Sequence, residues 1–522
     1  MAYTSSSFVV LVCITLIVYY SLPRNIRWVS LLVSSLAFYV LAGFNALIYI
    51  IFTSILVYFI ALKLQKINDK QKNLFNSKDN DWLKEHKKEY TNNFKKEKKK
   101  YLLLALIISL GILIIVKYLP TFLNSAILFF SINTNPVNIL MPLGISFYTF
   151  TSIAYLVDIF YGKIEAEKNY FKFLLFISFF PAIVQGPISR ANQLLPQLIK
   201  GNAFNTQKFC FGSQLILWGL IKKLVIADIL VMFSNSILND INNYSGSVIL
   251  LATIFGSIEL YTNFSGGIDI IRGVAECFGI DMVQNFKQPF FSVGLTDYWR
   301  RWHISLGAFM KDYVLMPLNL SKFMMKVGKK SRNKFGVKVG KLVPVFISTF
   351  IVFFLVGIWH GPNFKYIVFG LLNGFITSME SLYQNLKTKK EYTKIGKTIK
   401  YVFSLMYGIL IVHFVKIISM SNNVTSAFTT FEKIIFDFNI HSLNISILDN
   451  LQINVFSIII AILTFILVLF VEILKENNIQ VRNLILKQNI VIRYAIWIGL
   501  IFFMLIYSSH GNAMGGFAYE GF

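Results

Sequence analysis

Twelve apolar runs, most of them close to the length that crosses a lipid bilayer, follow one another along this 522-residue chain. A helix needs about 20 mainly apolar residues to span the hydrocarbon core, and a shorter run must tilt, break or re-enter. Only 14% of the residues are charged and 55% are hydrophobic, which excludes a soluble enzyme, a disordered chain and a disulfide scaffold. The sequence therefore predicts an all-α, polytopic membrane protein. The runs lie near residues 7–22, 28–42, 45–62, 101–119, 138–160, 209–235, 247–264, 343–358, 364–380, 401–420, 454–473 and 491–508.

Basic residues are concentrated in alternate loops. Lys and Arg total 50 against 25 acidic residues. In a membrane protein such an excess keeps the basic loops on the cytoplasmic side, so we do not interpret it as a sign of nucleic-acid binding. Twelve spans then place both termini outside, including the tail 509–522, which has no Lys or Arg. The predicted cytoplasmic loops are 63–100, 300–341 and 386–400, and the predicted outer segments are 120–137, 236–246 and 421–453.

We expect one membrane domain over 1–522, without internal repeats or a soluble domain. Segment 63–100 is rich in Lys, Asn and Glu and is predicted to be either disordered or a polar helix. Segment 264–342 is too polar for a simple span, yet it contains several aromatic residues. Amphipathic helices at the cytoplasmic interface, or re-entrant helices that line a cavity, explain this mixture.

His360 is the first candidate for a functional group. Ionisable side chains at membrane depth are costly and usually functional. His360 ends an apolar run between Trp359 and Gly361-Pro362, and such helix breaks are tolerated where the chain lines a cavity enclosed by protein. A catalytic histidine and an interfacial histidine beside an aromatic-belt Trp explain this pattern equally well.

Segment 296–306 is the second candidate, because two arginines and a histidine are flanked there by two tryptophans. Asp297 and Arg301 are four residues apart and can pair on one helix face. A basic amphipathic helix on anionic lipid is one interpretation, and a cationic pocket for a phosphorylated donor is the other. The residues of that donor pocket are Trp299, Arg300, Arg301 and Trp302, with His303 at its edge.

Other catalytic signatures are missing from the sequence. It contains no nucleophile elbow, no P-loop and no H-E-x-x-H motif, so a serine hydrolase and a P-loop pump are not expected. Cys13, Cys210 and Cys277 lack metal-ligand spacing, so no metal site is predicted.

Five stretches, in order, resemble the membrane-bound O-acyltransferase (MBOAT) family: 141–150, 155–158, 180–190, 297–306 and 357–361. The nearer resemblance is to the bacterial polysaccharide O-acetyltransferase branch (AlgI and PatA type), and the D-alanyl transfer proteins (DltB type) are more distant. The resemblance implies a ring of tilted helices around a central funnel in the bacterial cytoplasmic membrane. It also implies a cytoplasmic acyl-thioester donor and an acceptor outside.

By motif, His360 matches the family's essential histidine, and His303 matches the histidine of its R-W-H element. The resemblance implies no bound cofactor, and a donor that is acetyl-CoA or an acyl carrier protein. Arg300 and Arg301 would attract the donor's phosphates. The implied partners are the lipid bilayer, an extracytoplasmic SGNH-type acyltransferase and either an acyl carrier protein or a small membrane protein.

The C-terminal residues form the pattern F-x-Y-x-x-F, with Phe517, Tyr519 and Phe522 at the defined positions. This spacing resembles the end of the small protein that accompanies the D-alanyl transfer proteins, whose tyrosine is thought to carry the acyl group. Phe517 and Phe522 would anchor the tail while Tyr519 relays the acyl group. The alternative is a frayed chain end.

Together these features predict a membrane O-acyltransferase. An acyl group, in the first instance acetyl, would move from a cytoplasmic thioester to Tyr519 or a separate carrier, with His360 as general base. O-acylation of a cell-envelope or secreted polysaccharide would follow. The alternatives are D-alanyl transfer to teichoic acid and, from another class, a transporter, although no inverted repeat is visible.

Overall fold

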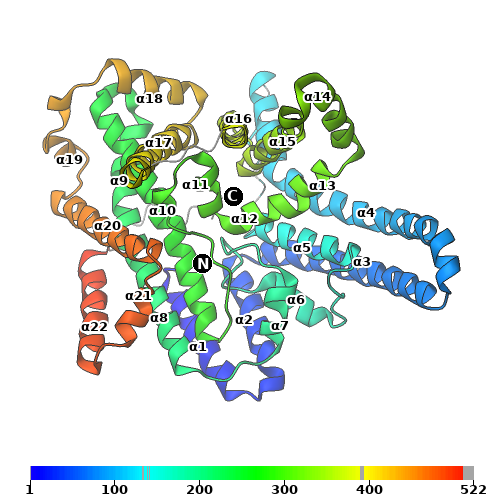
Figure 1. Ribbon diagram of the computed structural model, residues 1–522. Helices are drawn as coiled ribbons and strands as arrows, with labels where there is room; N and C mark the ends of the chain where they lie inside the picture. The colour runs from blue at the N-terminus through cyan, green and yellow to red at the C-terminus, as the bar shows by residue number, and fades with distance from the viewer. Residues whose placement is uncertain (1, 132–133, 138, 140–141, 388–392, 509–522) are drawn as a thin grey trace. The chain divides into compact units, whose positions relative to one another are not determined.

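The computed structural model describes residues 2–131, 134–137, 139, 142–387 and 393–508, and within these ranges it contains helices and no strand (Figure 1). The prediction of an all-α membrane protein is confirmed, and each of the twelve apolar runs is helical over most of its length. Eight helices among the described residues are long and apolar enough to cross a membrane. They are 24–42, 47–76, 80–129, 246–277, 343–360, 394–420, 455–476 and 490–507.

Four apolar runs, 7–22, 138–160, 209–235 and 364–380, fall outside that criterion, and helix length or a helix irregularity explains the first three. Helices α1 (Ser6–Ser21) and α5 (Ile145–Phe160) have 16 residues each, about 24 Å at 1.5 Å per residue, against a hydrocarbon core of about 30 Å. The run 209–235 is divided by a π-helical turn at Lys222–Ala227. Eight of the twelve apolar runs thus meet the criterion, and the short or broken helices among the rest agree with the expectation that some runs are tilted, broken or re-entrant.

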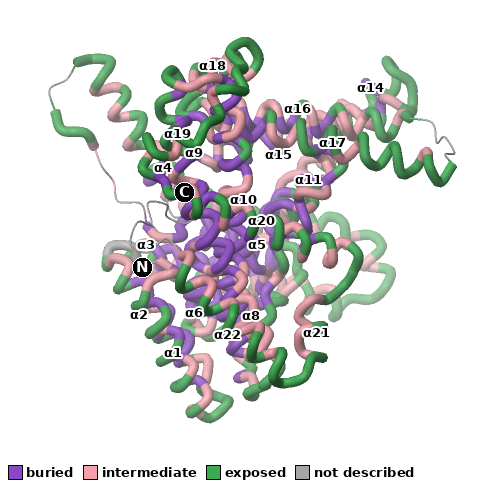
Figure 2. Tube along the Cα trace, turned by 90° about the vertical axis from the view of Figure 1, so that its left-hand side faces the viewer, coloured by how far each residue is buried: buried purple, intermediate pink, exposed green. Residues whose placement is uncertain are grey.

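Contacts within the chain group its described residues into two compact units, one comprising residues up to 212 together with 271–283, and the other 213–270 together with 284–508. In the first unit every residue of α5 except Val157 is buried, so this helix forms the core (Figure 2). The single membrane domain over 1–522 stays a prediction. The other helices that lie wholly in this unit are α1, α2 (Arg27–Ala42), α3 (Phe44–Asn76), α4 (Asn80–Phe129), α6 (Tyr170–Ser178) and α7 (Ala191–Ile199).

The charged segment 63–100 is a polar helical hairpin. It covers the end of α3 and the beginning of α4, and the Asp79 carboxylate caps α4 by accepting a hydrogen bond from Trp82 N at 2.9 Å. With 50 residues, α4 is about 75 Å long, more than twice the thickness of the hydrocarbon core. Its polar half therefore extends beyond any span, and of the two expectations for this segment the polar helix is the one observed.

The second unit contains the predicted site. Residues 264–277 continue the long helix α10 (Gly246–Cys277), and the rest of the predicted polar region forms short helices followed by a basic one. Helix α8 (Thr206–Ile221), like α10, has residues in both units. The other helices of this unit are α9 (Asp228–Asn239), α11 (Leu295–Arg301), α12 (Ile304–Met310), α13 (Met316–Asn319), α14 (Lys322–Gly340), α15 (Val343–His360), α16 (Phe364–Leu386), α17 (Lys394–Met420), α18 (Val424–Phe436), α19 (Ser446–Asn450), α20 (Val455–Glu476), α21 (Val481–Leu486) and α22 (Ile490–Tyr507).

Helices α15 and α16 form a closely packed hairpin that places His360 at its turn. A Cβ atom added to Gly370 would lie 2.5 Å from the Phe353 carbonyl oxygen and 3.0 Å from Gly357 Cα. One added to Gly357 would lie 2.4 Å from the Tyr366 carbonyl oxygen. Small residues at a helix crossing let two backbones approach in this way, so these glycines set the position of the end of α15.

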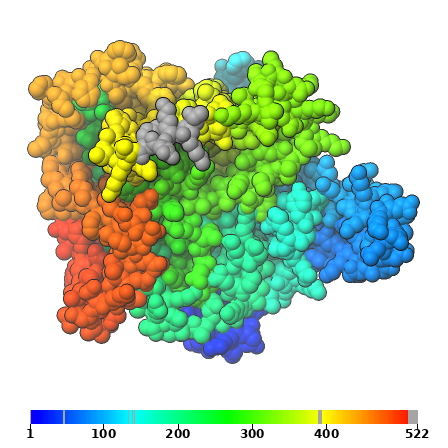
Figure 3. Space-filling model, in the orientation of Figure 1, coloured from blue at the N-terminus to red at the C-terminus, as the bar shows by residue number. Residues whose placement is uncertain are grey.

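The last helix shows what surrounds the protein. None of the residues of α22 is buried, although the helix is apolar almost throughout. Figure 3 shows this orange-to-red end of the chain at the molecular surface. Such a surface is unfavourable in water and natural in lipid, in agreement with a multi-pass membrane protein.

Candidate active site

Helix α11 carries three of the four residues of the predicted donor pocket, Trp299, Arg300 and Arg301, and its first turn is held by Glu380 of α16. The Glu380 carboxylate accepts hydrogen bonds from Leu295 N (2.9 Å), Thr296 N (2.7 Å) and the Thr296 hydroxyl (2.7 Å). The first N–H groups of a helix have no partner within the helix, and a negative charge is favourable beside them. Glu380 therefore fixes where α11 begins.

The predicted ion pair between Asp297 and Arg301 is confirmed, with Arg301 Nε 2.9 Å from Asp297 Oδ2. Arg301 Nη1 also donates to both carboxylate oxygens of Glu476 in α20, at 3.0 and 2.9 Å. A guanidinium between two carboxylates has its charge compensated. These contacts make Arg301 an anchor of α11, and its role in donor binding stays a prediction.

The two tryptophans of the motif lie in different surroundings. Trp299 Nε1 donates to Asn373 Oδ1 at 2.9 Å, and the residue lines a cavity. Trp302 is buried and stacks on Tyr298, with 5.5 Å between the ring centroids. Lys416 Nζ lies 4.8 Å from the centroid of the Trp302 ring. Trp299 is thus placed to meet a ligand, and Trp302 packs in the protein interior.

His303 breaks the helix between α11 and α12 in an unusual backbone conformation. Its φ of 47° and ψ of 51° are left-handed, which is uncommon for a residue other than glycine and often marks a functional site. Segment 285–287 runs beside it, with Lys287 N bonded to the Arg301 carbonyl (2.9 Å) and Ile304 N to the Asn285 carbonyl (3.0 Å). These two hydrogen bonds fix the backbone on either side of His303, where the helix is interrupted.

The imidazole of His303 is enclosed by protein and is 2% exposed. Its Nδ1 lies 3.3 Å from Asn285 Oδ1, and its ring meets the Phe264 ring edge-on at 5.0 Å. Burial, and to a smaller extent the charge that His360 can carry, lowers the pKa of His303 to about 3. His303 is therefore neutral at physiological pH.

His360 is the last residue of α15 and lies among aromatic rings. It stacks on Tyr366 at 5.8 Å and meets Phe369 edge-on at 5.6 Å. The Trp359 ring is 5.0 Å from the His360 ring and 6.1 Å from the His303 ring, between centroids. The two histidine motifs, far apart in sequence, therefore meet at Trp359.

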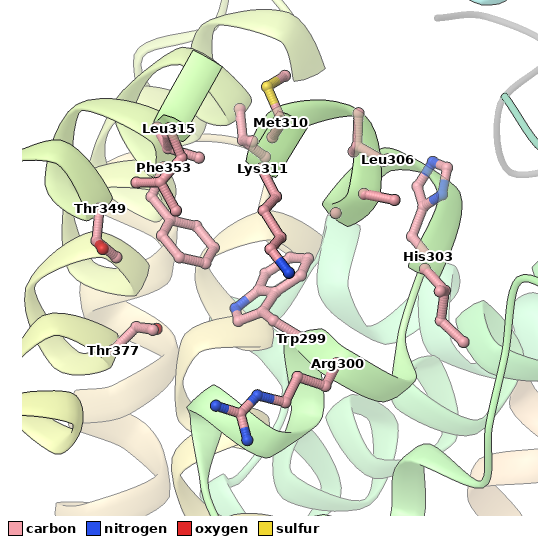
Figure 4. Close-up of a pocket in the computed structure, with 15 residues that line it drawn as sticks. Trp299, Arg300, His303, Leu306, Met310, Lys311, Leu315, Thr349, Phe353 and Thr377 are labelled. Carbon is pink, nitrogen blue, oxygen red and sulfur yellow. The ribbon is translucent and has the colours of Figure 1, made fainter. Parts of the chain in front are cut away.

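A cavity of about 350 Å³ opens beside His303, and its walls are mainly apolar (Figure 4). Arg300 and Lys311 add two exposed cations to its lining. Figure 4 shows the Lys311 side chain extending toward the indole of Trp299. Lys311 begins a π-helical turn, Lys311–Leu315, and such turns are frequent at functional sites.

The cavity follows one face of α15 toward His360. Thr349, Phe353 and Val356 line it, and their spacing of three and four residues places them on one helix face. His360 follows Val356 by four residues and continues that face, although it does not itself line the cavity. His303 thus lines the cavity, and the cavity ends one helical turn before His360.

Three residues of this arrangement are absent from the predicted site: Lys311, Asn285 and Glu380. Lys311 is one of eleven basic residues in 300–341, and nothing in the sequence distinguishes it from the others. Asn285 and Glu380 carry no sequence signal, because their roles depend on contacts with distant segments. The predicted tail residues Phe517, Tyr519 and Phe522 lie outside the described residues, so their roles stay predictions.

Comparison with known proteins finds a matching family model and several similar sequences. The model of the MBOAT (membrane-bound O-acyltransferase) family matches residues 72–422. A probable alginate O-acetylase AlgI of Pseudomonas syringae pv. tomato is 33% identical over 291 residues, which cover 55% of this chain and 52% of that protein.

More distant relatives act on other polymers, according to their names. A peptidoglycan O-acetyltransferase of Helicobacter pylori is 29% identical over 322 residues, covering 57% of this chain and 58% of that protein. A teichoic acid D-alanyltransferase of Bacillus subtilis is 29% identical over 286 residues, covering 53% of this chain and 69% of that protein. The chain thus spans about half the length of the alginate O-acetylase that it matches.

Proposed function

Because the chain belongs to the membrane-bound O-acyltransferase family, we propose that it transfers an acyl group, in the first instance acetyl, for O-acylation of a cell-envelope or secreted polysaccharide. The donor is a cytoplasmic thioester, and the protein lies in the bacterial cytoplasmic membrane. The observation that carries this proposal is the meeting of His303 and His360 at Trp359, beside a cavity with two exposed cations.

The cavity suits a phosphorylated thioester. Acetyl-CoA and an acyl carrier protein both present the acyl group on a phosphopantetheine arm, which is narrow and ends in a phosphate. Arg300 and Lys311 are exposed cations on the cavity lining and would bind that phosphate by charge-assisted hydrogen bonds. The mainly apolar walls would hold the arm, with its thioester directed along α15 toward His360.

The chemical step needs one base. His360 takes the proton of the acceptor hydroxyl, and the hydroxyl oxygen forms a bond to the thioester carbonyl carbon. The C–S bond then breaks, and the leaving thiolate recovers the proton from the imidazolium. The products are an ester and a thiol, and the step as written uses no metal ion or resident cofactor.

The acceptor hydroxyl belongs to Tyr519 or to a small separate carrier on the outer side. An extracytoplasmic SGNH-type acyltransferase then moves the acyl group from that ester to the polysaccharide. A covalent ester intermediate divides one difficult acyl transfer into two easier ones. A transporter would have no need for two histidines that meet beside a ligand cavity.

D-alanyl transfer to teichoic acid is the second candidate, and the F-x-Y-x-x-F spacing of the tail favours it. It shares the fold and both histidines, and it differs in the donor, a charged D-alanyl thioester on a carrier protein. The identity of the accepted thioester therefore separates the two candidates.

The experiment supplies the full chain, in lipid nanodiscs, with acetyl-CoA, acetylated carrier protein or D-alanylated carrier protein, each labelled in the acyl group. Thiol release and recovery of the label as an ester are measured. We expect an acetyl thioester to be consumed faster than the D-alanyl thioester. Preference for the D-alanyl donor would select the second candidate, and no turnover of any thioester would contradict both.

A further inference from the structure

Asn285 connects the segment before α11 to the histidine that lines the cavity. Its side-chain oxygen accepts hydrogen bonds from Ser305 N (2.9 Å) and from the Ser305 hydroxyl (2.9 Å). The same oxygen lies 3.3 Å from His303 Nδ1. Asn285 is 0% exposed, His303 2% and Ser305 6%, so water does not compete for these bonds.

The contact with Ser305 determines which way the Asn285 amide is turned. A backbone N–H can only donate a hydrogen bond, so the Asn285 atom that faces Ser305 N must be the carbonyl oxygen. The amide nitrogen, Nδ2, is buried and has no hydrogen-bond partner among the described residues. The carboxamide is therefore held through its oxygen.

The same argument assigns the proton on His303. The Asn285 oxygen is an acceptor only, so a hydrogen bond between it and His303 Nδ1 requires a hydrogen on Nδ1. A neutral imidazole carries one N–H, and the lone pair then belongs to Nε2. In a functional histidine, the hydrogen bond that one ring nitrogen makes to a neighbouring residue commonly determines which tautomer is present.

We propose that Asn285 is a positioning residue of the acyl-transfer site, which holds His303 as the neutral Nδ1–H tautomer so that Nε2 accepts a hydrogen bond from the bound donor. The inference rests on the proposed function. His303 then orients the phosphopantetheine arm, which carries amide N–H groups, while His360 moves the proton. Because His303 is a positioned acceptor in this arrangement, gaining a proton would remove its contribution.

Two variants of Asn285 test this division of roles. Asn285→Ala removes the acceptor, and we expect kcat/KM for the donor to fall about 10- to 100-fold, a loss of the size seen when the hydrogen-bond partner of a metal-bound histidine is removed. Asn285→Asp keeps an acceptor oxygen but adds a negative charge, which raises the pKa of a neighbouring histidine. That variant should be active at alkaline pH and lose activity as the pH falls, whereas the wild type should show no such loss from His303.

The matched control is Asn263→Ala, because Asn263 is also buried in the second unit and its amide nitrogen donates a hydrogen bond to Glu259. This control should leave the shape of the pH profile unchanged. Nitrogen-15 NMR of histidine-labelled protein, assigned with a His303→Gln variant, gives a readout that does not depend on activity. We expect His303 to show protonated Nδ1 and unprotonated Nε2, and Asn285→Ala to show a mixture.

The two proposals fail in distinguishable ways. An Nε2–H signal for His303 in the wild type, or an Asn285→Ala protein with wild-type kcat/KM and pH profile, would overturn the inference. If Asn285→Ala does not fold, the pH profile of Asn285→Asp decides, and a profile identical to that of the wild type counts against it. Absence of all thioester turnover would overturn the proposed function, and the NMR measurement would still determine the tautomer.

Discussion

At the residue scale, the cationic side chains of the site differ in whether they are held in ion pairs or exposed. Arg301 is held by Asp297 and Glu476, whereas Arg300 and Lys311 are exposed on the cavity lining. Adjacent arginines in one sequence motif thus have different roles: one stabilises α11, and the other is available to a ligand. This difference gives separate expectations for their substitution.

Arg300→Gln and Lys311→Gln should each raise KM for the thioester donor about tenfold, with kcat little changed. A hydrogen bond to a charged group contributes about 1.5 kcal/mol or more, and about 1.4 kcal/mol corresponds to a factor of ten. Lys326→Gln in α14, an exposed cation that does not line the cavity, is the control and should leave KM unchanged. Steady-state kinetics measure these values, and equal KM values for all four proteins would remove the two cations from donor binding.

Tyr519→Phe should abolish polysaccharide acylation while the protein stays folded, because only the hydroxyl is lost. A phenol is a weak nucleophile at neutral pH and needs a base such as His360. With the partner transferase deleted, mass spectrometry of the C-terminal peptide should find an acyl group on Tyr519, and its mass distinguishes acetyl from D-alanyl. A fully active Tyr519→Phe protein would exclude the tail relay and leave a separate carrier as acceptor.

At the element scale, the α15–α16 hairpin controls where His360 lies. Gly370→Leu would force a side chain against the backbone of α15, where even a Cβ atom comes within 2.5 Å of the Phe353 carbonyl oxygen. Overpacking of this kind costs about 1–3 kcal/mol. We expect a lower melting temperature and at least a roughly tenfold loss of kcat, since small displacements of catalytic groups are costly.

Gly499→Leu in α22 is the matched control for that substitution, because no atom lies within 4 Å of a Cβ added there. It should keep both the melting temperature and kcat. Thermal unfolding in detergent and single-turnover kinetics measure the two quantities. A Gly370→Leu protein as active and as stable as Gly499→Leu would show that the close helix crossing does not position the site.

The elements differ in how far their sequences predict them. The spacing of four between Asp297 and Arg301 is enough to predict an ion pair, because it is local. Apolar content predicts that α5 is a helix but does not distinguish a lipid-facing helix from a buried one. Asn285 and Glu380 could not be predicted, since each acts through a contact with a segment that only the tertiary structure brings near.

At the scale of the whole molecule, the distribution of basic residues predicts which side of the membrane each loop faces, and with it the direction of the proposed acyl transfer. Cysteines introduced into the polar hairpin 63–100 should react with an impermeant reagent only after the membrane is opened. Cysteines in 421–453 should react in intact cells. Labelling with the reverse pattern would invert the topology and place the donor and the acceptor on the opposite sides.

The central claim is that the chain is an acyltransferase in which His360 supplies the base. The most direct test is single-turnover transfer from a labelled acyl thioester by the wild type, His360→Ala and His441→Ala, the last being an exposed histidine outside the cavity. Ester formation by His360→Ala should be at least about 10²-fold slower than in the other two proteins, with an unchanged melting temperature. A His360→Ala protein that forms the ester at the wild-type rate would contradict the account.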